Sequence, residues 1–472
     1  MTKERFASLN DRMSTPIGRL GDIVRSPLIV LALILGCHGT YVAFTGLVMS
    51  PDSFTYSLWA DKLIAHRFNY RAYLVGTESN FPPLLYLGFV TIVALVKVLA
   101  GSAWAVAIIA LNLVAESLVG ALLVKTVLDV THSRLAAWGA LGLYLICFEI
   151  FNWTHFVLSD STFLLISFAL FALMAKVLLT HRPRWVFLTW PTVLALVFLA
   201  LFYRPTGIVL LPVIMVAFWL WPHRQRANAA FEPLHFHPGV IGAGVFLATA
   251  LVLAHGYFVQ DPARWPFQAL SHTIRYTAGN YAAGMVVSGR PVTFHAPPVS
   301  LPDYAAITTA RFLYFFSFLS SDFSLPHNLI AALFFAPTYL LAGVGLYGLF
   351  RRGTGLNGRE ERVVVLSILL VLAFSFFHAL IHLDFDWRYR VPVMPHLIFL
   401  AALGIRTVQH RFTGTRASYR ITSVPFNRRP AEKSENSFAA GGAQPAYRRA
   451  AYSCAPALRT LSAPEPRRHM LP

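Results

Sequence analysis

Residues 27–56 of this chain read PLIVLALILGCHGTYVAFTGLVMSPDSFTY, a long apolar run that ends in a short polar segment. A helix needs about 20 apolar residues to cross a bilayer core, whereas a barrel strand needs about 10 alternating ones. This run is continuous rather than alternating, so it predicts a transmembrane helix. Similar runs recur as far as Arg406, which indicates an all-α, polytopic membrane helix bundle.

The composition places the whole chain in the same class. Hydrophobic residues make up 56% of the 472 residues, charged residues only 13%, and the mean hydropathy is +0.57. Cys37, Cys147 and Cys454 are widely spaced, which favours neither disulfides nor a zinc site. We expect about ten or eleven spans, near residues 27–49, 83–100, 103–128, 135–151, 156–180, 185–202, 208–221, 240–259, 328–350, 363–381 and 391–405.

Charge and polarity divide the chain into three parts. Residues 1–25 are polar and basic, with no cleavage site of a signal peptide, and are expected in the cytoplasm. Residues 26–406 hold the spans, with outer loops at about 50–82 and 260–326. Residues 407–472 form a basic tail that is expected to be disordered. The formal net charge is +18, and half of it lies in the segment from Arg406 onward. We interpret this segment as a cytoplasmic tail beside anionic membrane lipids, not as a nucleic-acid binder.

Lysine and arginine in the short loops predict the orientation of the spans. The cytoplasmic face is expected to hold the N-terminal segment, 125–134, 181–184, 223–226, 351–362 and the tail. The opposite face is expected to hold the loops around Asp52, 152–160, Arg204, 261–322 and 384–390. Runs 83–100 and 103–128 are both long enough to cross, yet this charge pattern allows one net crossing between them.

Unusual polar residues gather on the predicted outer face. They are Asp52, Glu78, Asn80, Asp160, Arg204, His382, Asp384, Asp386, Arg388 and Arg390. Ionisable groups next to hydrocarbon lose hydration and are seldom placed there without a use. Acids and bases from several helices at one depth predict a site at the membrane–water boundary, with a substrate that is partly lipid. Glu116 and Glu149 lie within apolar runs and are expected to have structural partners inside the bundle.

Four segments of the outer face also occur in a recognisable order. They are Pro51-Asp52-Ser53 with Tyr56 and then Phe81-Pro82-Pro83-Leu84-Leu85-Tyr86, Leu158-Ser159-Asp160, Phe202-Tyr203-Arg204-Pro205-Thr206-Gly207, and Asp386-Trp387-Arg388-Tyr389-Arg390-Val391-Pro392-Val393-Met394-Pro395. The order resembles that of the C-type (GT-C) integral-membrane glycosyltransferases, which use polyprenyl-phosphate sugars. Within that superfamily, the bacterial proteins resembling dolichyl-phosphate-mannose protein mannosyltransferases and the lipopolysaccharide-core transferases are nearest. Ser53 stands where many relatives carry a second acid, so metal dependence stays open.

The resemblance implies transfer of a sugar from a polyprenyl-phosphate donor to a lipid, glycan or protein acceptor. Asp52 would take the proton of the acceptor hydroxyl, and Asp160 would orient acceptor or metal. Capping a helix is the alternative role for both carboxylates. The implied location is the bacterial inner membrane with the site facing the periplasm, although an endoplasmic-reticulum location fits the same physics.

Three arginines would bind the donor phosphate, because guanidinium binds phosphate bidentately. They are Arg204, Arg388 and Arg390. Snorkelling at the membrane interface is the alternative for Arg204, and an ion pair with Asp384 or Asp386 is the alternative for Arg388.

Further residues are expected to contact the substrates. They are Tyr56, Glu78, Asn80, His382 and Arg275. His378 and His382 are four residues apart, a spacing that could hold a metal, but only Asp384 is available nearby as a third ligand. No metal site is therefore predicted and no cofactor is certain, although a divalent metal remains open.

Other functions fit parts of the pattern. A lipid-linked glycan ligase or polymerase would also have its site on the outer face. It would use arginines and a histidine of a large loop, and Arg275, Arg290 and His272 could supply them. A secondary transporter would place ionisable residues at mid-membrane within related repeats, and no repeat is recognisable. An inactive relative would keep the apolar pattern and lose only the function of Asp52.

Overall fold

The computed structural model describes residues 23–75, 83–180, 183–220, 301–320, 323–351, 354–380 and 387–412. All of them belong to the first of two units, Met1–Ala417 and Ser418–Pro472. Regular structure in these residues is helical, apart from one isolated bridge between Val48 and Phe156. The prediction of an all-α polytopic bundle is confirmed. The predicted span 240–259, the loop up to 300 and the basic tail beyond 412 lie outside the described residues.

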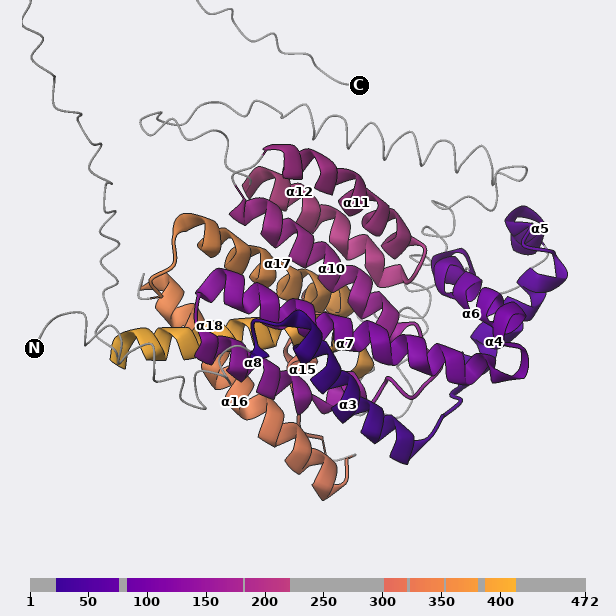
Figure 1. The fold of residues 1–472 in the computed structure, drawn as a ribbon, viewed down its shortest axis with the longest axis horizontal. Coiled ribbons are helices and arrows are strands. Elements are labelled where there is room, and N and C mark those ends of the chain that lie inside the picture. Colours follow the sequence, from indigo (N-terminus) through magenta and orange to yellow (C-terminus); the bar gives the residue numbers. More distant parts are fainter. Residues whose placement is uncertain are drawn as a thin grey trace, which may run out of the picture. The chain divides into compact units, whose positions relative to one another are not determined.

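Within the described residues, six segments are long and apolar enough to cross a membrane, so this is a multi-pass membrane protein. They comprise α3 (Pro27–Thr45), α6 and α7 (Leu87–Ala100 and Trp104–Thr131), α10 (Asp160–Leu179), α16 (Leu325–Phe350), α17 (Gly358–Leu380), and α18 (Met394–Phe412) with the 3₁₀ turn η5 (Trp387–Val393) before it. Other helices and 3₁₀ turns complete the described chain (Figure 1). They are α4 (Pro51–Ala65), α5 (Tyr70–Val75), η1 (Pro83–Tyr86), η2 (Gly101–Ala103), α8 (Arg134–Leu145), α9 (Phe148–Phe151), α11 (Pro183–Leu201), η3 (Pro205–Val209), α12 (Leu210–Leu220) and α15 (Leu301–Phe315).

Contacts between distant residues define two ends of the bundle. At one end, Ser133 Oγ donates a hydrogen bond to Gln409 at 2.5 Å and His132 Nε2 lies 2.9 Å from Glu360 Oε1. We call this the Arg25 end, because Arg25 lies there, before α3. At the other end, the Asp52 end, the first turn of α4 contacts η5. The described loops fall at the two ends as the charge pattern predicts.

The segment 83–131 turns back on itself at Gly101, which ends α6 with a φ of +56°. Tyr86, before α6, is within electrostatic range of Asp160 at the start of α10. Asn112, two turns into α7, donates to the Phe156 carbonyl at 2.9 Å, again close to the start of α10. The chain therefore leaves the Asp52 end and returns to the same level before α7 crosses. This explains how two long apolar runs make one net crossing.

The polar segment at residue 50 begins helix α4 and is not an extended loop. Ser50 accepts a hydrogen bond from the Ser53 N–H at 3.2 Å, and Ser53 Oγ accepts one from the Ser50 N–H at 3.0 Å. This reciprocal capping box, with Pro51 in the first turn, fixes the start of the helix. Lys97 of α6 bonds Asp61 at 2.7 Å and holds α4 against α6. Much of the outer loop predicted at 50–82 is therefore helical.

Close packing of α16 against α18 anchors the C-terminal part of the fold. A Cβ on Gly404 would lie 1.9 Å from the Leu341 carbonyl oxygen, and one on Gly345 would lie 2.7 Å from that of Leu400. Small residues allow the two backbones to touch, as is common between membrane helices. Because η5 leads directly into α18, this packing also fixes the position of η5.

Glu116 has the buried partners that the sequence predicts. It contacts His38 Nδ1 through one carboxylate oxygen and accepts a hydrogen bond from Thr154 Oγ1 at 3.1 Å through the other. His38 Nε2 lies 3.2 Å from the carbonyl of Leu145, where α8 ends. The predicted span 135–151 is broken at this point, and Glu149 in the following turn α9 pairs at the Asp52 end instead.

Candidate functional site

The ion pair between Asp52 and Arg388 joins α4 to η5. An oxygen of Asp52 lies 2.6 Å from a terminal nitrogen of Arg388, and the two side chains are 43% and 18% exposed. Ser50 and not Asp52 is the N-cap of α4, and Asp52 lies in the first turn of that helix. Asp52 presents an accessible carboxylate at the Asp52 end of the bundle. Asp384 and Asp386, the predicted partners of Arg388, lie outside the described residues.

A second ion pair, between Asp160 and Arg204, lies deeper in the protein. Arg204 donates to Asp160 in the first turn of α10, and their side chains are 8% and 2% exposed. Snorkelling at the interface is therefore the wrong description of Arg204. The turn η3 that follows it is tight, because a Cβ on Gly207 would lie 2.0 Å from the Ala200 carbonyl oxygen. Glycine at this position thus allows the chain to present Arg204 inward.

Electrostatic interactions link the two ion pairs. Burial acts to lower the pKa of Arg204, but Asp160, Tyr86 and Tyr56 raise it above its ordinary value, with a smaller opposing effect of Arg388. Arg204 is therefore a permanent cation in reach of both pairs. The four residues Asp52, Arg388, Asp160 and Arg204 form one charged cluster, which we call the four-residue cluster.

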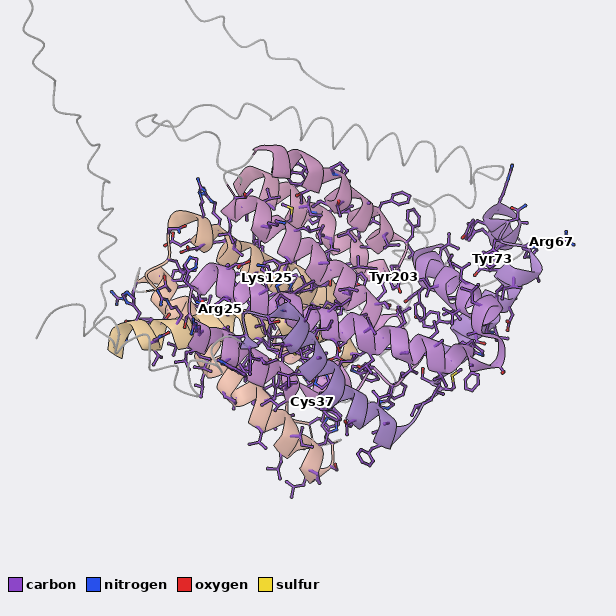
Figure 2. The ribbon with its side chains drawn as sticks, in the orientation of Figure 1. Arg25, Cys37, Arg67, Tyr73, Lys125 and Tyr203 are labelled. Atoms are coloured by element: carbon purple, nitrogen blue, oxygen red, sulfur yellow. The ribbon has the colours of Figure 1, made fainter. Side chains whose placement is uncertain are left out.

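Aromatic rings lie beside this cluster. The ring of Tyr56 lies 5.5 Å from that of Tyr86 and 5.0 Å from that of Phe89, which in turn lies 5.9 Å from Tyr203. Figure 2 labels Tyr203 and shows the side chains around it. Burial raises the pKa of Tyr56 well above its usual range, and the nearby Tyr86 adds to the effect. Tyr56 therefore remains a neutral hydroxyl and does not act as a base near neutral pH.

Several buried polar atoms near Arg204 have no hydrogen-bond partner within the described part of the chain. They are Ser159 Oγ, Thr206 Oγ1 and His378 Nε2. Ser159 precedes Asp160, Thr206 lies in the turn after Arg204, and the His378 ring stacks on Tyr389 at 4.7 Å. Most buried polar groups in proteins are satisfied, so such atoms mark positions where a bound molecule or water would bond.

Arg390 does not fit its predicted phosphate-binding role. It bonds Glu149 through two nitrogens, with Nε 2.7 Å from Oε2, and donates to the carbonyls of Phe315 and Ser317. Its guanidinium also lies 4.2 Å from the ring centre of Trp387, and the side chain is 2% exposed. A buried arginine with this many partners ties α9, α15 and η5 together and is a structural residue.

The remaining predicted substrate contacts fall on segments that the structure does not describe. They are Glu78, Asn80, His382 and Arg275. Within the described ranges, no three His, Cys, Asp or Glu side chains could share a metal ion. Asp52 and Asp160 each pair with an arginine, an arrangement that does not resemble a metal site.

Two residues of the site received no role from the sequence. Tyr86 and Tyr203 both occur in the recognised segments, and Tyr203 donates to Thr162 Oγ1 at 2.5 Å. Glu149 has the buried partner that the sequence predicts, and its pairing with Arg390 places it at the Asp52 end. The position of Tyr203 beside Arg204 could have identified it, whereas Tyr86 adjoins only apolar residues and nothing in the sequence pairs Glu149 with Arg390.

Comparison with protein-family models, curated proteins and solved structures found no match for this chain. The function must therefore be inferred from the residues of the four-residue cluster and their geometry.

Proposed function

We propose that this protein is a membrane glycosyltransferase that transfers a sugar from a polyprenyl-phosphate donor to a lipid, glycan or protein acceptor. The observation that carries the proposal is the ion pair of Asp52 and Arg388, with Asp52 43% exposed. It places a carboxylate able to accept a proton beside a guanidinium able to bind phosphate. The two residues also belong to the first and last of the four segments that resemble GT-C enzymes.

The proposed reaction forms one bond as it breaks another. The acceptor oxygen bonds to the anomeric carbon of the sugar while the bond from that carbon to the phosphate oxygen breaks. The hydroxyl proton passes to Asp52, and the leaving polyprenyl phosphate keeps the bonding electron pair. Arg388 stabilises the charge that develops on this phosphate.

The observed ion pair implies that the donor binds before Asp52 accepts a proton. Asp52 and Arg388 neutralise each other in the structure, at 2.6 Å. The donor phosphate is a diester with one negative charge, like a carboxylate, and its oxygens also bind guanidinium bidentately, so it would compete with Asp52 for Arg388. Asp52 would then be free to act as a base only when the donor is present.

The buried pair has a supporting role in the proposal. Asp160 and Arg204 are almost inaccessible, so neither is placed to exchange protons with an acceptor. They hold the start of α10 against η3, beside Tyr56 and Tyr86. Asp160 is therefore assigned as a positioning residue, and its predicted catalytic role is replaced by this one.

Lysine and arginine distribution supports an orientation with the Asp52 end on the non-cytoplasmic face, which is the periplasmic face in the bacterial inner membrane that we propose as the location. The Arg25 end carries Arg25, Lys125, Arg134, Lys176 and Arg351, in keeping with a cytoplasmic surface. Cysteine substitution of Arg67, next to α4, would test this orientation. It should react with a membrane-impermeant thiol reagent added to intact cells, whereas cysteine at Lys125 should not, after Cys37 is replaced by serine in both variants.

The proposal is tested by sugar transfer from a panel of radiolabelled polyprenyl-phosphate monosaccharides, using purified membranes. The compared proteins are the wild type, Asp52→Asn and Asp61→Asn, at equal protein levels. Asp61 is a matched control, because it lies on α4, pairs with Lys97 and is 58% exposed. Transfer that is lost only in Asp52→Asn supports the proposal. Transfer that survives in Asp52→Asn removes Asp52 as the base, and the absence of transfer from every donor contradicts a lipid-donor transferase.

One observation favours a transporter as the second candidate. His38 and Glu116 form a buried pair near the middle of α3 and α7, and ionisable residues at such depths often lie on ion pathways. A transporter would lose substrate-driven proton movement in proteoliposomes when Glu116 is replaced by glutamine. Sugar transfer that is unaffected by the same change would assign the pair to structure alone.

A further inference from the structure

A pocket of about 540 Å³ opens at the Arg25 end of the bundle, away from the four-residue cluster. Its lining residues are Arg25, Leu128, Asp129, His132, Lys176, Leu179 and Thr180. They come from the start of α3 and the ends of α7 and α10. Figure 2 shows Arg25 and Lys125 on the left of the view and Tyr203 on the right. Asp160 and Thr180 mark opposite ends of α10, about 30 Å apart by the helix rise, so the pocket is a separate site.

The lining of the pocket is predominantly cationic. Arg25 and Lys176 supply a guanidinium and an ammonium group, and Thr180 adds a hydroxyl. The one carboxylate among these lining residues, Asp129, lies 2.7 Å from Nζ of Lys125, a residue that does not line the pocket. We propose that this pocket binds the phosphate group of an anionic molecule.

Ordered contacts fix the wall of the pocket on the α7 side. His132 ends α7 in a left-handed conformation with φ +52°, and its Nε2 lies 2.9 Å from Glu360. Glu360 also accepts hydrogen bonds from Asn357 at 2.6 and 2.8 Å. The end of α7 is thereby tied to the start of α17, so a bound molecule meets a formed pocket.

The phosphate could belong to a lipid head group or to a soluble molecule. Leu128 and Leu179 line the pocket beside the charged groups, which suits a head group with its attached acyl chains. Basic pockets between membrane helices are a known setting for phosphate head groups. A volume of 540 Å³ also falls in the range of pockets for small soluble ligands, about 300–1,000 Å³.

The alternative is that Arg25 and Lys176 only stabilise the ends of helices and bind no ligand. Lys176 lies in the last turn of α10, where a positive charge stabilises the negative end of the helix dipole. The same negative end opposes an anion, so binding of phosphate would depend on the side chains. Removing Arg25 and Lys176 together therefore separates the two explanations.

The test uses the purified full-length protein in a neutral detergent. Native mass spectrometry measures binding of phosphatidylglycerol, with phosphatidylcholine as the neutral-lipid comparison, and calorimetry measures binding of inorganic phosphate. The Arg25→Gln/Lys176→Gln variant is compared with wild type and with Arg351→Gln. Arg351 is a matched control, because it is an exposed cation after α16 at the same end and does not line the pocket.

We expect phosphatidylglycerol to bind the wild type and Arg351→Gln equally, and the double variant at least 10-fold more weakly. Binding of inorganic phosphate with the same dependence on Arg25 and Lys176 would also support the proposal and would identify a soluble source. Equal binding by all three proteins would overturn it. So would a lack of preference for phosphatidylglycerol over phosphatidylcholine together with no binding of inorganic phosphate. A double variant that unfolds is replaced by Asp129→Asn, which should bind phosphate more tightly than wild type, and unchanged or weaker binding would overturn the proposal.

Discussion

The carboxylate of Asp52 lies 2.6 Å from the guanidinium of Arg388, so the polar segment after the first apolar run is bonded to the 3₁₀ turn before the last described helix. The contact joins α4 to η5 at the Asp52 end of the bundle through two partly exposed groups of opposite charge. Their arrangement gives the ion pair two possible roles, to hold α4 against η5 or to supply a base and a phosphate ligand.

Exchanging the two residues separates these roles. The Asp52→Arg/Arg388→Asp variant keeps an ion pair but places the cation on α4 and the carboxylate on η5. We expect it to fold with a melting temperature close to that of wild type and to lose sugar transfer by about 100-fold or more, the usual contribution of a general base. Size-exclusion chromatography, thermal unfolding and transfer assays measure the outcome. If the exchanged variant retains activity, the Asp52–Arg388 pair has only a structural role.

The buried pair should behave differently from an exposed pair. Asp160→Asn leaves the Arg204 cation in a site where its side chain is 8% exposed, without its counter-charge. Breaking a buried ion pair by removing one partner costs about 3–5 kcal/mol. Asp61→Asn removes an acid that is 58% exposed, and such pairs contribute about 0–1 kcal/mol. Thermal unfolding in detergent compares the two variants, and similar losses in both would contradict the distinction.

The sequence predicted the helical class and the two-ended distribution of loops because long apolar runs and basic loops are local features. It also singled out Asp52, Asp160, Arg204 and Arg388, since charges beside hydrocarbon are conspicuous in composition. The partner of each residue could not be predicted. Arg388 pairs with Asp52, which is distant from it in sequence, and this pairing depends on how α4 and η5 meet in three dimensions.

The predicted helix boundaries failed where a contact between distant residues breaks an apolar run. The predicted span 135–151 looks continuous in hydropathy, yet α8 ends at Leu145 and α9 begins at Phe148. The carbonyl of Leu145 there lies 3.2 Å from His38 Nε2 of α3. Hydropathy along the sequence does not reveal that a buried polar group of another helix contacts the chain at this break.

Tyr56 gives a prediction for alkaline pH. Burial raises its pKa in the folded protein above the ordinary value of about 10. As the pH rises above 10 the unfolded chain loses this proton first, so the folded state loses stability relative to it. Below pH 10 both states hold the proton and no effect is expected. The melting temperatures of wild type and Tyr56→Phe should therefore change in parallel from pH 7 to 9, and that of wild type should fall more steeply above pH 10. Parallel curves over the whole range would contradict a raised pKa.

Arg388 and Arg390 stand two residues apart in η5 and should have opposite phenotypes when each is replaced by lysine. Arg390 bonds Glu149 through two nitrogens and stacks on Trp387 at 4.2 Å, contacts that a single ammonium group does not reproduce. We expect Arg390→Lys to lower stability by about 2–3 kcal/mol with little change in the KM for the donor. Arg388 is 18% exposed and its partner Asp52 is 43% exposed, so Arg388→Lys should leave stability nearly unchanged. Because it removes bidentate binding of phosphate, it should raise the KM for the donor about 10-fold. Thermal unfolding and initial rates against donor concentration measure both effects, and a rise in KM confined to Arg390→Lys would move the phosphate site to Arg390.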